Sequence, residues 1–158
     1  MFNIGDRVVY PMHGAGVIEG IEEKDLGGNI EEYYIIKLTM GEMKVMIPVS
    51  NVDLVGIREV ISEDEVDKVF EVLKGENTKM SSNWNRRYRA NMEKIKSGSI
   101  FEVAEVVRNL SLRDREKGLS TGERKMLENA RQILLSELVL AQNLAEEQAE
   151  ALLEECFN

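Results

Sequence analysis

The sequence has one cysteine, Cys156, and one histidine, His13, among its 158 residues. A single cysteine cannot form an internal disulfide, and neither residue can build a cysteine-rich or histidine-rich metal site alone. No apolar run approaches the ~20 residues that cross a bilayer. The N-terminal residues also lack the basic and apolar regions of a signal peptide. We therefore expect a soluble cytoplasmic protein with no metal, no cofactor and no membrane partner.

Side chains for covalent or acid–base catalysis are equally scarce. Cys156 stands beside Glu154 and Glu155, whose negative charges disfavour the reactive thiolate. His13 lies in a Pro-Met-His-Gly segment, which is typical of a turn between strands. The sequence therefore predicts that this protein is not an enzyme.

The formal net charge is −9, but the charges are distributed unevenly along the chain. Residues 1–60 hold 5 basic and 10 acidic side chains, whereas residues 79–133 hold 13 basic and 7 acidic ones. Because salt screens each charge beyond about 8 Å, a polyanion would respond to this basic middle segment more than to the net charge. The same counts are typical of a solvated helical surface with paired charges. Composition alone leaves both interpretations open.

The first 60 residues have the short, β-branched, glycine-punctuated pattern of an all-β module. Five strands are predicted, at residues 6–10, 16–22, 33–38, 43–47 and 51–55. Gly27, Gly28 and Gly41 stand where tight hairpin turns need a positive φ. Short strands joined by tight turns predict a small, strongly bent antiparallel β-barrel, which we assign to residues 1–56.

After residue 60 the apolar residues recur at helical spacing, and helix start signals repeat. We expect helices at residues 63–73, 83–96, 100–117, 121–141 and 144–156. Capping boxes, or their Asn variant, are predicted to begin at Ser62, Ser99, Ser120 and Asn143. The expected fold is therefore α+β, with a compact five-helix domain over residues 61–158 after the barrel.

The segment 83–91, Asn-Trp-Asn-Arg-Arg-Tyr-Arg-Ala-Asn, combines the only tryptophan with three arginines. At about 100° per residue, Trp84 and Tyr88 share one helix face, while Arg86 and Arg89 lie on the other side. On this pattern Trp84 is most simply a core residue. An aromatic ring among arginines at a helix start is also typical of DNA or RNA contact, with guanidiniums on phosphates and the ring against bases. Periodicity alone does not decide between them.

Four stretches of the sequence closely resemble the bacterial CarD/CdnL family, in the family's order and spacing. They are residues 6–14, 83–91, 104–108 and 119–123. The resemblance implies a Tudor-like (SH3-like) barrel that docks on the β subunit of bacterial RNA polymerase. It also implies a helical domain that contacts promoter DNA at the upstream edge of the transcription bubble, without strong sequence specificity. Such proteins regulate transcription by stabilising the open complex, and we expect a free monomer that joins the nucleoid through RNA polymerase.

Matched residue by residue, the resemblance assigns Trp84 to a wedge at the minor groove of the upstream fork. Arg86, Arg89 and Arg124 match basic positions implicated in DNA contact. The predicted DNA-binding set is Trp84, Arg86, Arg87, Arg89, Arg124 and Lys125.

In the barrel, Lys24 matches a basic position of the polymerase contact. Met46 occupies a position that is arginine in some relatives, which removes a fork of hydrogen-bond donors. Apolar packing or strand pairing along residues 43–47 would then have to compensate. The predicted polymerase-binding set is Lys24, Val45, Met46 and Ile47.

Two other functions fit parts of the sequence. The protein could be an adaptor on RNA polymerase with no direct DNA contact, in which Trp84 is a core residue. It could also be a Tudor-like ligand binder that uses Tyr10, Tyr33 and Tyr34 as an aromatic cage. Strand alternation puts Tyr33 and Tyr34 on opposite faces, which weakens the cage interpretation.

Overall fold

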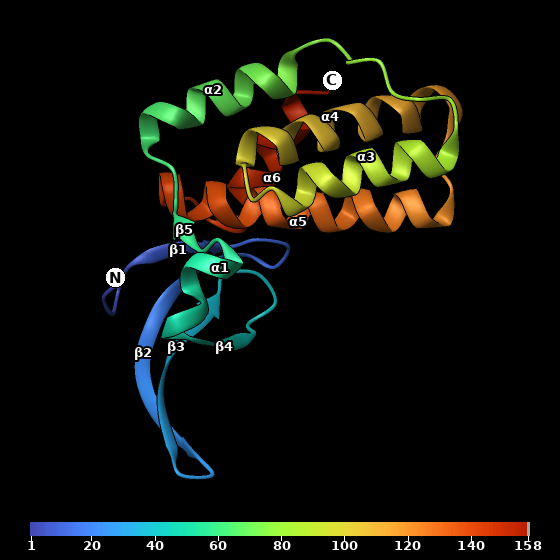
Figure 1. Cartoon of the computed structure of the whole chain (residues 1–158). Coiled ribbons are helices and arrows are strands. Elements are labelled where there is room, and N and C mark those ends of the chain that lie inside the picture. The colour runs from blue at the N-terminus through green and yellow to red at the C-terminus, as the bar shows by residue number, and fades with distance from the viewer. Residues whose placement is uncertain (158) are drawn as a thin grey trace.

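The computed structural model describes residues 1–157, which form a β-rich N-terminal part and a helical C-terminal part (Figure 1). The strands are β1 (Arg7–Tyr10), β2 (Gly14–Leu26), β3 (Asn29–Leu38), β4 (Lys44–Pro48) and β5 (Arg58–Glu59). A 3₁₀ helix, η1 (Val49–Asn51), and a short helix, α1 (Val52–Val55), lie between β4 and β5. The remaining helices are α2 (Glu63–Lys74), α3 (Trp84–Lys96), α4 (Ile100–Lys117), α5 (Thr121–Gln142) and α6 (Glu146–Glu155). The α+β class with a helical domain after the sheet is confirmed.

The five strands form one antiparallel sheet in the order β4-β3-β2-β1-β5. Its core contains Val8, Ile18, Tyr34, Ile36 and Ile47, which are all at most 3% exposed. The register of β2 and β3 shifts just after Ile18, and such a bulge increases local twist and bending. Within residues 1–157 no pairing joins β4 to β5, so the sheet stays open where the sequence predicts a closed barrel.

The predicted strand at residues 51–55 is wrong, because this segment is helical. Gly56 adopts a left-handed φ of 85° and ends α1 with a hydrogen bond from its N–H to the Val52 carbonyl. Val52 therefore faces the sheet core from a helical turn. The fifth strand is β5, whose Arg58 and Glu59 pair with β1 just beyond the predicted end of the barrel at residue 56.

The β2–β3 hairpin is longer than the rest of the sheet. Its pairs run from Gly16 with Leu38 out to Leu26 with Asn29, whereas β4 reaches only Tyr33. The outer part of the hairpin therefore projects away from the molecule as a two-stranded arm (Figure 1).

The helices pack around one core in which α4 and α5 are central. Val69, Val107, Leu110, Leu134 and Leu138 are fully buried there. Burial of one such side chain stabilises the fold by roughly 1.5–3 kcal/mol, so amphipathic spacing is enough to select these helices. The five predicted helices are confirmed, with ends shifted by two residues at most. No helix within the described chain combines the length and apolar character needed to span a membrane.

The predicted helix starts are only partly correct. Ser62 and Ser120 cap α2 and α5, while Ser99 caps α4 without a side-chain hydrogen bond. Asn143 is not an N-cap, because it ends α5 in a left-handed conformation with φ 53°. An asparagine tolerates this conformation better than most residues, so it suits a helix end. Ala145 begins α6 instead.

Candidate nucleic-acid interface

The predicted DNA-binding residues lie where two helices begin. Helices α3 and α5 run side by side in the same direction, and both start at the end of the helical domain remote from the sheet (Figure 1). Asn83 caps α3 by accepting a hydrogen bond from the Arg86 N–H at 3.0 Å. Ser120 caps α5 by accepting one from the Glu123 N–H at 3.2 Å. Each cap satisfies a backbone donor that a helix start leaves without a partner, which fixes both starts in place.

The Trp84 ring lies at the surface between these two helix starts, and the residue is 41% exposed. It stacks on Tyr88 with centroids 5.0 Å apart and an interplanar angle of 20°. Its Nε1–H donates a hydrogen bond to Ser120 Oγ at 2.9 Å. A Cβ at Gly122 would lie 3.3 Å from the ring, so a glycine there lets the indole approach α5 closely. Tyr88 and Ser120 hold the ring on one side, and its other side is open to solvent. Trp84 is therefore not a core residue. We call this end of α3 and α5 the aromatic end.

Exposed cations lie in the first two turns of α3 and α5. Arg86, Arg89, Arg124 and Lys125 are all exposed. Arg124 forms an ion pair with Asp114 at 3.7 Å. None of the ion pairs found among residues 1–157 involves Arg86, Arg89 or Lys125. Their positive charge is therefore available to a partner.

Arg87 corrects the predicted set, because it is buried and only 4% exposed. Its Nε and Nη2 donate to the two carboxylate oxygens of Glu123 at 2.7 and 3.1 Å, and Nη1 donates to the Ser81 carbonyl at 3.1 Å. One step along a helix turns a side chain by about 100°, so Arg87 faces α5 while Arg86 faces solvent. Arg87 ties α3 to α5 beneath the aromatic end and offers no charge to a ligand.

The Arg87–Glu123 pair stays ionised. Hydrogen bonds from Arg87 are the main cause that lowers the pKa of Glu123, against the opposing effect of burial. The positive charges of Arg87 and Arg113 lower the pKa of Glu123 further. The hydrogen bond to Glu123 raises the pKa of Arg87 above its usual value. A buried pair of this kind is costly to break, because the remaining charge would have no partner.

Sequence reasoning missed how the ring is positioned. The pattern Ser-Thr-Gly-Glu predicts Ser120 as a helix cap, and the structure confirms that role. The second role of Ser120, as acceptor for the indole N–H, joins residues 36 positions apart. Glu123 was predicted to complete the capping box, but its carboxylate binds Arg87 instead. No local signal marks either contact, since both depend on the packing of α3 against α5.

The predicted polymerase-binding residues lie in two separate places, three of them on β4 and Lys24 on β2. Val45, Met46 and Ile47 belong to β4, an edge strand whose outer backbone groups have no partner strand within residues 1–157. Met46 is 40% exposed, whereas Ile47 is 3% exposed and points into the core. Lys24 pairs with Glu31 on the projecting hairpin, beyond the end of β4. Lys24 is four residues along β2 from the row of Met46, or about 13 Å at the usual rise of a strand.

A shallow pocket lies beside the exposed side of Met46. It has a volume of about 430 Å³ and is lined by Glu19, Gly20, Glu22, Ile35, Lys44 and Met46. Lys44 and Glu19 form an exposed ion pair across it at 3.0 Å. The side of the sheet next to β4 therefore offers a mixed apolar and charged surface.

The aromatic-cage interpretation is wrong. Tyr34 is 1% exposed, and its hydroxyl donates a hydrogen bond to the Phe2 carbonyl at 3.2 Å inside the sheet core. Tyr10 packs against the same core, and its ring centroid lies 4.3 Å from that of His13 at a tilt of 51°. The three tyrosines therefore do not enclose a common site.

Comparison with known proteins gives matches over most of the chain. Residues 2–61 match the model of the CarD-like/TRCF RID domain, and residues 68–154 match the model of the CarD C-terminal domain. A Bacillus subtilis (strain 168) protein named as a transcription factor, YdeB, is 43% identical over 149 residues, which cover 94% of this chain and 97% of that protein.

Two solved structures from Myxococcus xanthus are also similar. The NMR structure of the 72-residue N-terminal domain of CarD is 29% identical, with a TM-score of 0.33, and the match covers 37% of this chain and 79% of that one. The structure of CdnLNt is 40% identical, with a TM-score of 0.35, and the match covers 40% of this chain and 89% of that one.

Proposed function

Since the chain belongs to the CarD-like family of transcription regulators, we propose that it binds RNA polymerase through its sheet and promoter DNA through the aromatic end. The proposed docking partner is the polymerase β subunit, and the proposed DNA site is the upstream fork of the transcription bubble. The observation that carries this proposal is the Trp84 ring, which is 41% exposed, is held on one side by Tyr88 and Ser120, and lies at the start of two helices whose first turns carry exposed cations.

The ring would act by binding melted DNA more tightly than intact duplex. Separating two stacked base pairs costs a few kcal/mol, and at a fork that cost has already been met by melting. A preference of ~1.4 kcal/mol for the melted state would shift the ratio of open to closed complexes about tenfold. Trp84 is already oriented by Ser120 and Tyr88. A ring that is oriented in advance loses little conformational freedom on binding, which favours insertion.

The cations would hold phosphates without reading sequence. Arg86, Arg89 and Lys125 have free charges, and Arg124 shares its charge with Asp114. Up to four phosphate contacts give a slope of about −3.6 for log affinity against log salt. Binding to free DNA should therefore be weak at physiological salt, and polymerase would supply the high local concentration that the aromatic end needs.

The proposed polymerase contact is the open edge of β4. An edge strand presents unpaired backbone N–H and C=O groups, to which a strand of a partner can add. Val45 and Met46 would flank such a contact. The buried side chain of Ile47 would support it from within the core. Lys24 would contribute separately, from the projecting hairpin.

The decisive variant is Trp84→Ala, measured as the lifetime of open complexes formed by purified bacterial RNA polymerase. We expect the lifetime gain to fall about tenfold, which corresponds to ~1.4 kcal/mol. Because the ring is not in the core, the free energy of unfolding should fall by less than ~3 kcal/mol. Trp84→Phe keeps a ring but lacks the N–H, so its gain in open-complex lifetime should lie between those of wild type and Trp84→Ala. An unchanged lifetime in Trp84→Ala, with polymerase binding intact, would instead favour an adaptor with no DNA contact.

A further inference from the structure

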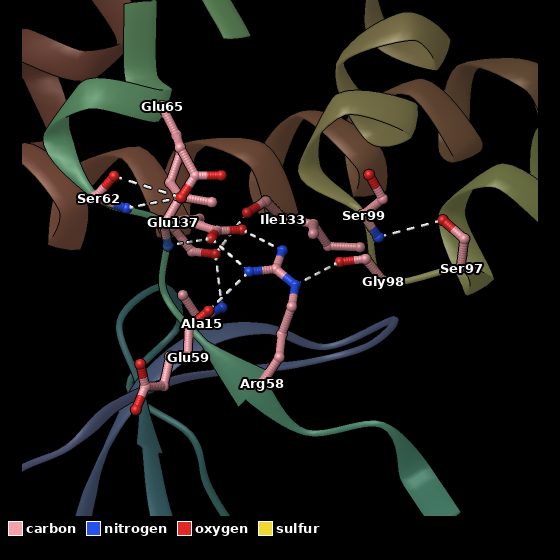
Figure 2. A network of polar contacts seen from close by, with 12 residues as sticks. Ala15, Arg58, Glu59, Ser62, Glu65, Ser97, Gly98, Ser99, Ile133 and Glu137 are labelled. Carbon is pink, nitrogen blue, oxygen red and sulfur yellow. Dashed lines mark hydrogen bonds and ion pairs between the residues drawn. The ribbon is translucent and has the colours of Figure 1, made fainter. Parts of the chain in front are cut away.

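A second, partly buried ion pair joins the sheet to the helical domain. Arg58 of β5 donates through Nη1 and Nη2 to the two carboxylate oxygens of Glu137 on α5, both at 2.7 Å (Figure 2). Arg58 Nε also donates to the Gly98 carbonyl, just after α3, at 2.8 Å. Glu137 accepts a further hydrogen bond from the Ile61 N–H at 2.9 Å. We call these four residues the junction clamp.

The junction clamp contacts both of the helices whose N-terminal ends form the aromatic end. Gly98 follows the C-terminus of α3, and Glu137 lies in the C-terminal part of α5. Because α3 and α5 run in the same direction, their other ends carry Trp84 and Ser120 (Figure 1). One arginine of the sheet therefore contacts both helices at the end opposite the indole.

Helix α5 connects the two attachment points, so fixing one end of the helix also fixes the position of the other end. Glu123 and Glu137 are separated by 14 residues, or about 21 Å of helix. At one end Glu123 binds Arg87 of α3, and at the other Glu137 binds Arg58 of the sheet. The pair of helices is thus fastened together at the aromatic end and fastened to the sheet at the junction clamp.

Two further contacts support the same junction. Ser136 Oγ accepts a hydrogen bond from the Ala15 N–H at 2.8 Å, and Arg7 donates to Asn143 Oδ1 at 2.8 Å and to the Leu140 carbonyl. A Cβ at Gly14 would lie 2.8 Å from Ser136 Oγ, so a glycine is needed for this close approach. The sheet and α5 are therefore packed in direct contact.

The chemistry of the junction clamp indicates a role in geometry. An ion pair with a buried member often adds little net stability compared with apolar residues of the same size, because Glu137 loses its water and Arg58 loses part of its own. Its bidentate hydrogen bonds, however, are satisfied in only one relative orientation of the two groups. An ion pair here therefore specifies an orientation that apolar packing alone would leave adjustable.

We propose that Arg58 and Glu137 are positioning residues that fix the reach and direction of Trp84 relative to the polymerase-bound sheet. This inference rests on the proposed function. If the sheet is anchored on polymerase, a rigid junction presents the indole at one place on the DNA. A loose junction would spread the ring over many positions and lower its effective concentration at the fork.

The test uses the full chain with Glu137→Ala, which removes all three hydrogen bonds that Glu137 accepts. Spin labels at Leu54→Cys and Asn129→Cys, in a Cys156→Ser background, report the distance between the sheet part and α5. We expect Glu137→Ala and Arg58→Ala to broaden this distance distribution. Both variants should bind polymerase within about twofold of wild type, because the junction is distant from β4. Their gain in open-complex lifetime should fall about threefold or more.

The matched control is Arg131→Ala, on the same helix. Arg131 pairs with Glu154 of α6, so this variant removes an ion pair that lies wholly within the helical domain. It should change neither the distance distribution nor the lifetime. Glu137→Gln keeps hydrogen-bonding capacity without the charge, and it should restore part of both readouts.

Two results would overturn the proposal. One is a distance distribution that stays as narrow as wild type in Arg58→Ala, the variant that also decides the case in which Glu137→Ala does not fold. The other is a broadened distribution with the full lifetime gain. If wild-type protein itself extends no lifetime, the proposed function fails, and the distance measurement still judges the junction clamp because it needs no polymerase.

Discussion

Each end of the α3–α5 pair is held by a bidentate ion pair between an arginine and a glutamate, but the two ends differ in what they present. At the aromatic end, the side chains of Arg87 and Glu123 are 4% and 2% exposed. At the junction clamp, those of Arg58 and Glu137 are 30% and 3% exposed. The first pair supports a surface that remains open to a partner, and the second closes a contact between two parts of the chain. The Arg87–Glu123 pair therefore supports the proposed binding surface, and the Arg58–Glu137 pair orients it relative to the sheet.

The largest effect is expected from breaking the more deeply buried pair. Arg87→Ala leaves Glu123 charged without its bidentate partner, so the free energy of unfolding should fall by ~3–5 kcal/mol. Denaturant unfolding of the full chain measures this loss. Arg86→Ala is the matched control, because it removes the neighbouring exposed arginine and should change stability by less than ~0.5 kcal/mol. A loss below ~1 kcal/mol in Arg87→Ala would mean that another cation, such as Arg113, replaces it.

Acid should weaken the same pair by a smaller amount. Arg87 lowers the folded-state pKa of Glu123, chiefly by hydrogen bonding, so this stabilisation is present above the unfolded value of ~4.3 and is lost as pH falls through the folded pKa. Wild type should therefore lose stability below about pH 4 more steeply than Glu123→Gln. The effect is smaller than in Arg87→Ala because a protonated Glu123 still accepts hydrogen bonds.

A second glutamate of the helical domain, Glu105, must be separated from Glu123 in the acid experiment. The hydrogen bond from Lys94 is the main cause that lowers the pKa of Glu105, which therefore titrates in the same direction. Glu105 is present in both proteins, so the difference between wild type and Glu123→Gln isolates Glu123. Parallel pH profiles for the two proteins would contradict the assignment.

The smallest effect is expected at Ser120, which affects the indole more than the fold. Ser120→Ala removes the cap of α5 and the acceptor for Trp84 Nε1, so stability should fall by about 1 kcal/mol. Acrylamide should then quench Trp84 fluorescence more strongly. Ser99→Ala is the matched control, since Ser99 begins α4 without a side-chain cap hydrogen bond. Equal quenching in wild type and Ser120→Ala would show that Tyr88 alone holds the ring.

Local sequence signals predicted most of the fold. Apolar spacing located the helices, and Ser62 and Ser120 marked two of their starts correctly. The errors occurred where one residue type suits two roles. The segment 51–55, which has two valines before Gly56, suits either a strand or a helical turn, and the left-handed Gly56 ends it as a helical turn. Asn143 was suited both to begin a helix and to end one.

The supporting contacts of the site could not be predicted from local pattern. Arg86, Arg87 and Arg89 look alike in sequence, and only the packing of α5 buries one of them. Arg87 finds Glu123 36 residues away, and Arg58 finds Glu137 79 residues away. The sequence thus identified the exposed ring and its cations as candidates, while the groups that fix their position emerged only from the tertiary structure.

The shared direction of α3 and α5 gives the molecule an electrical polarity. The N-terminus of a helix behaves as about half a positive charge, and two such ends meet beside Trp84. Helix α4 arrives there with its negative C-terminus but carries Arg115 and Lys117 in its last turn. Acidic residues outnumber basic ones in residues 1–60, and the last 25 residues hold six glutamates without a single basic side chain. A polyanion would thus repel the body of the molecule while attracting one tip, and the resulting torque would turn the protein tip-first before any contact forms.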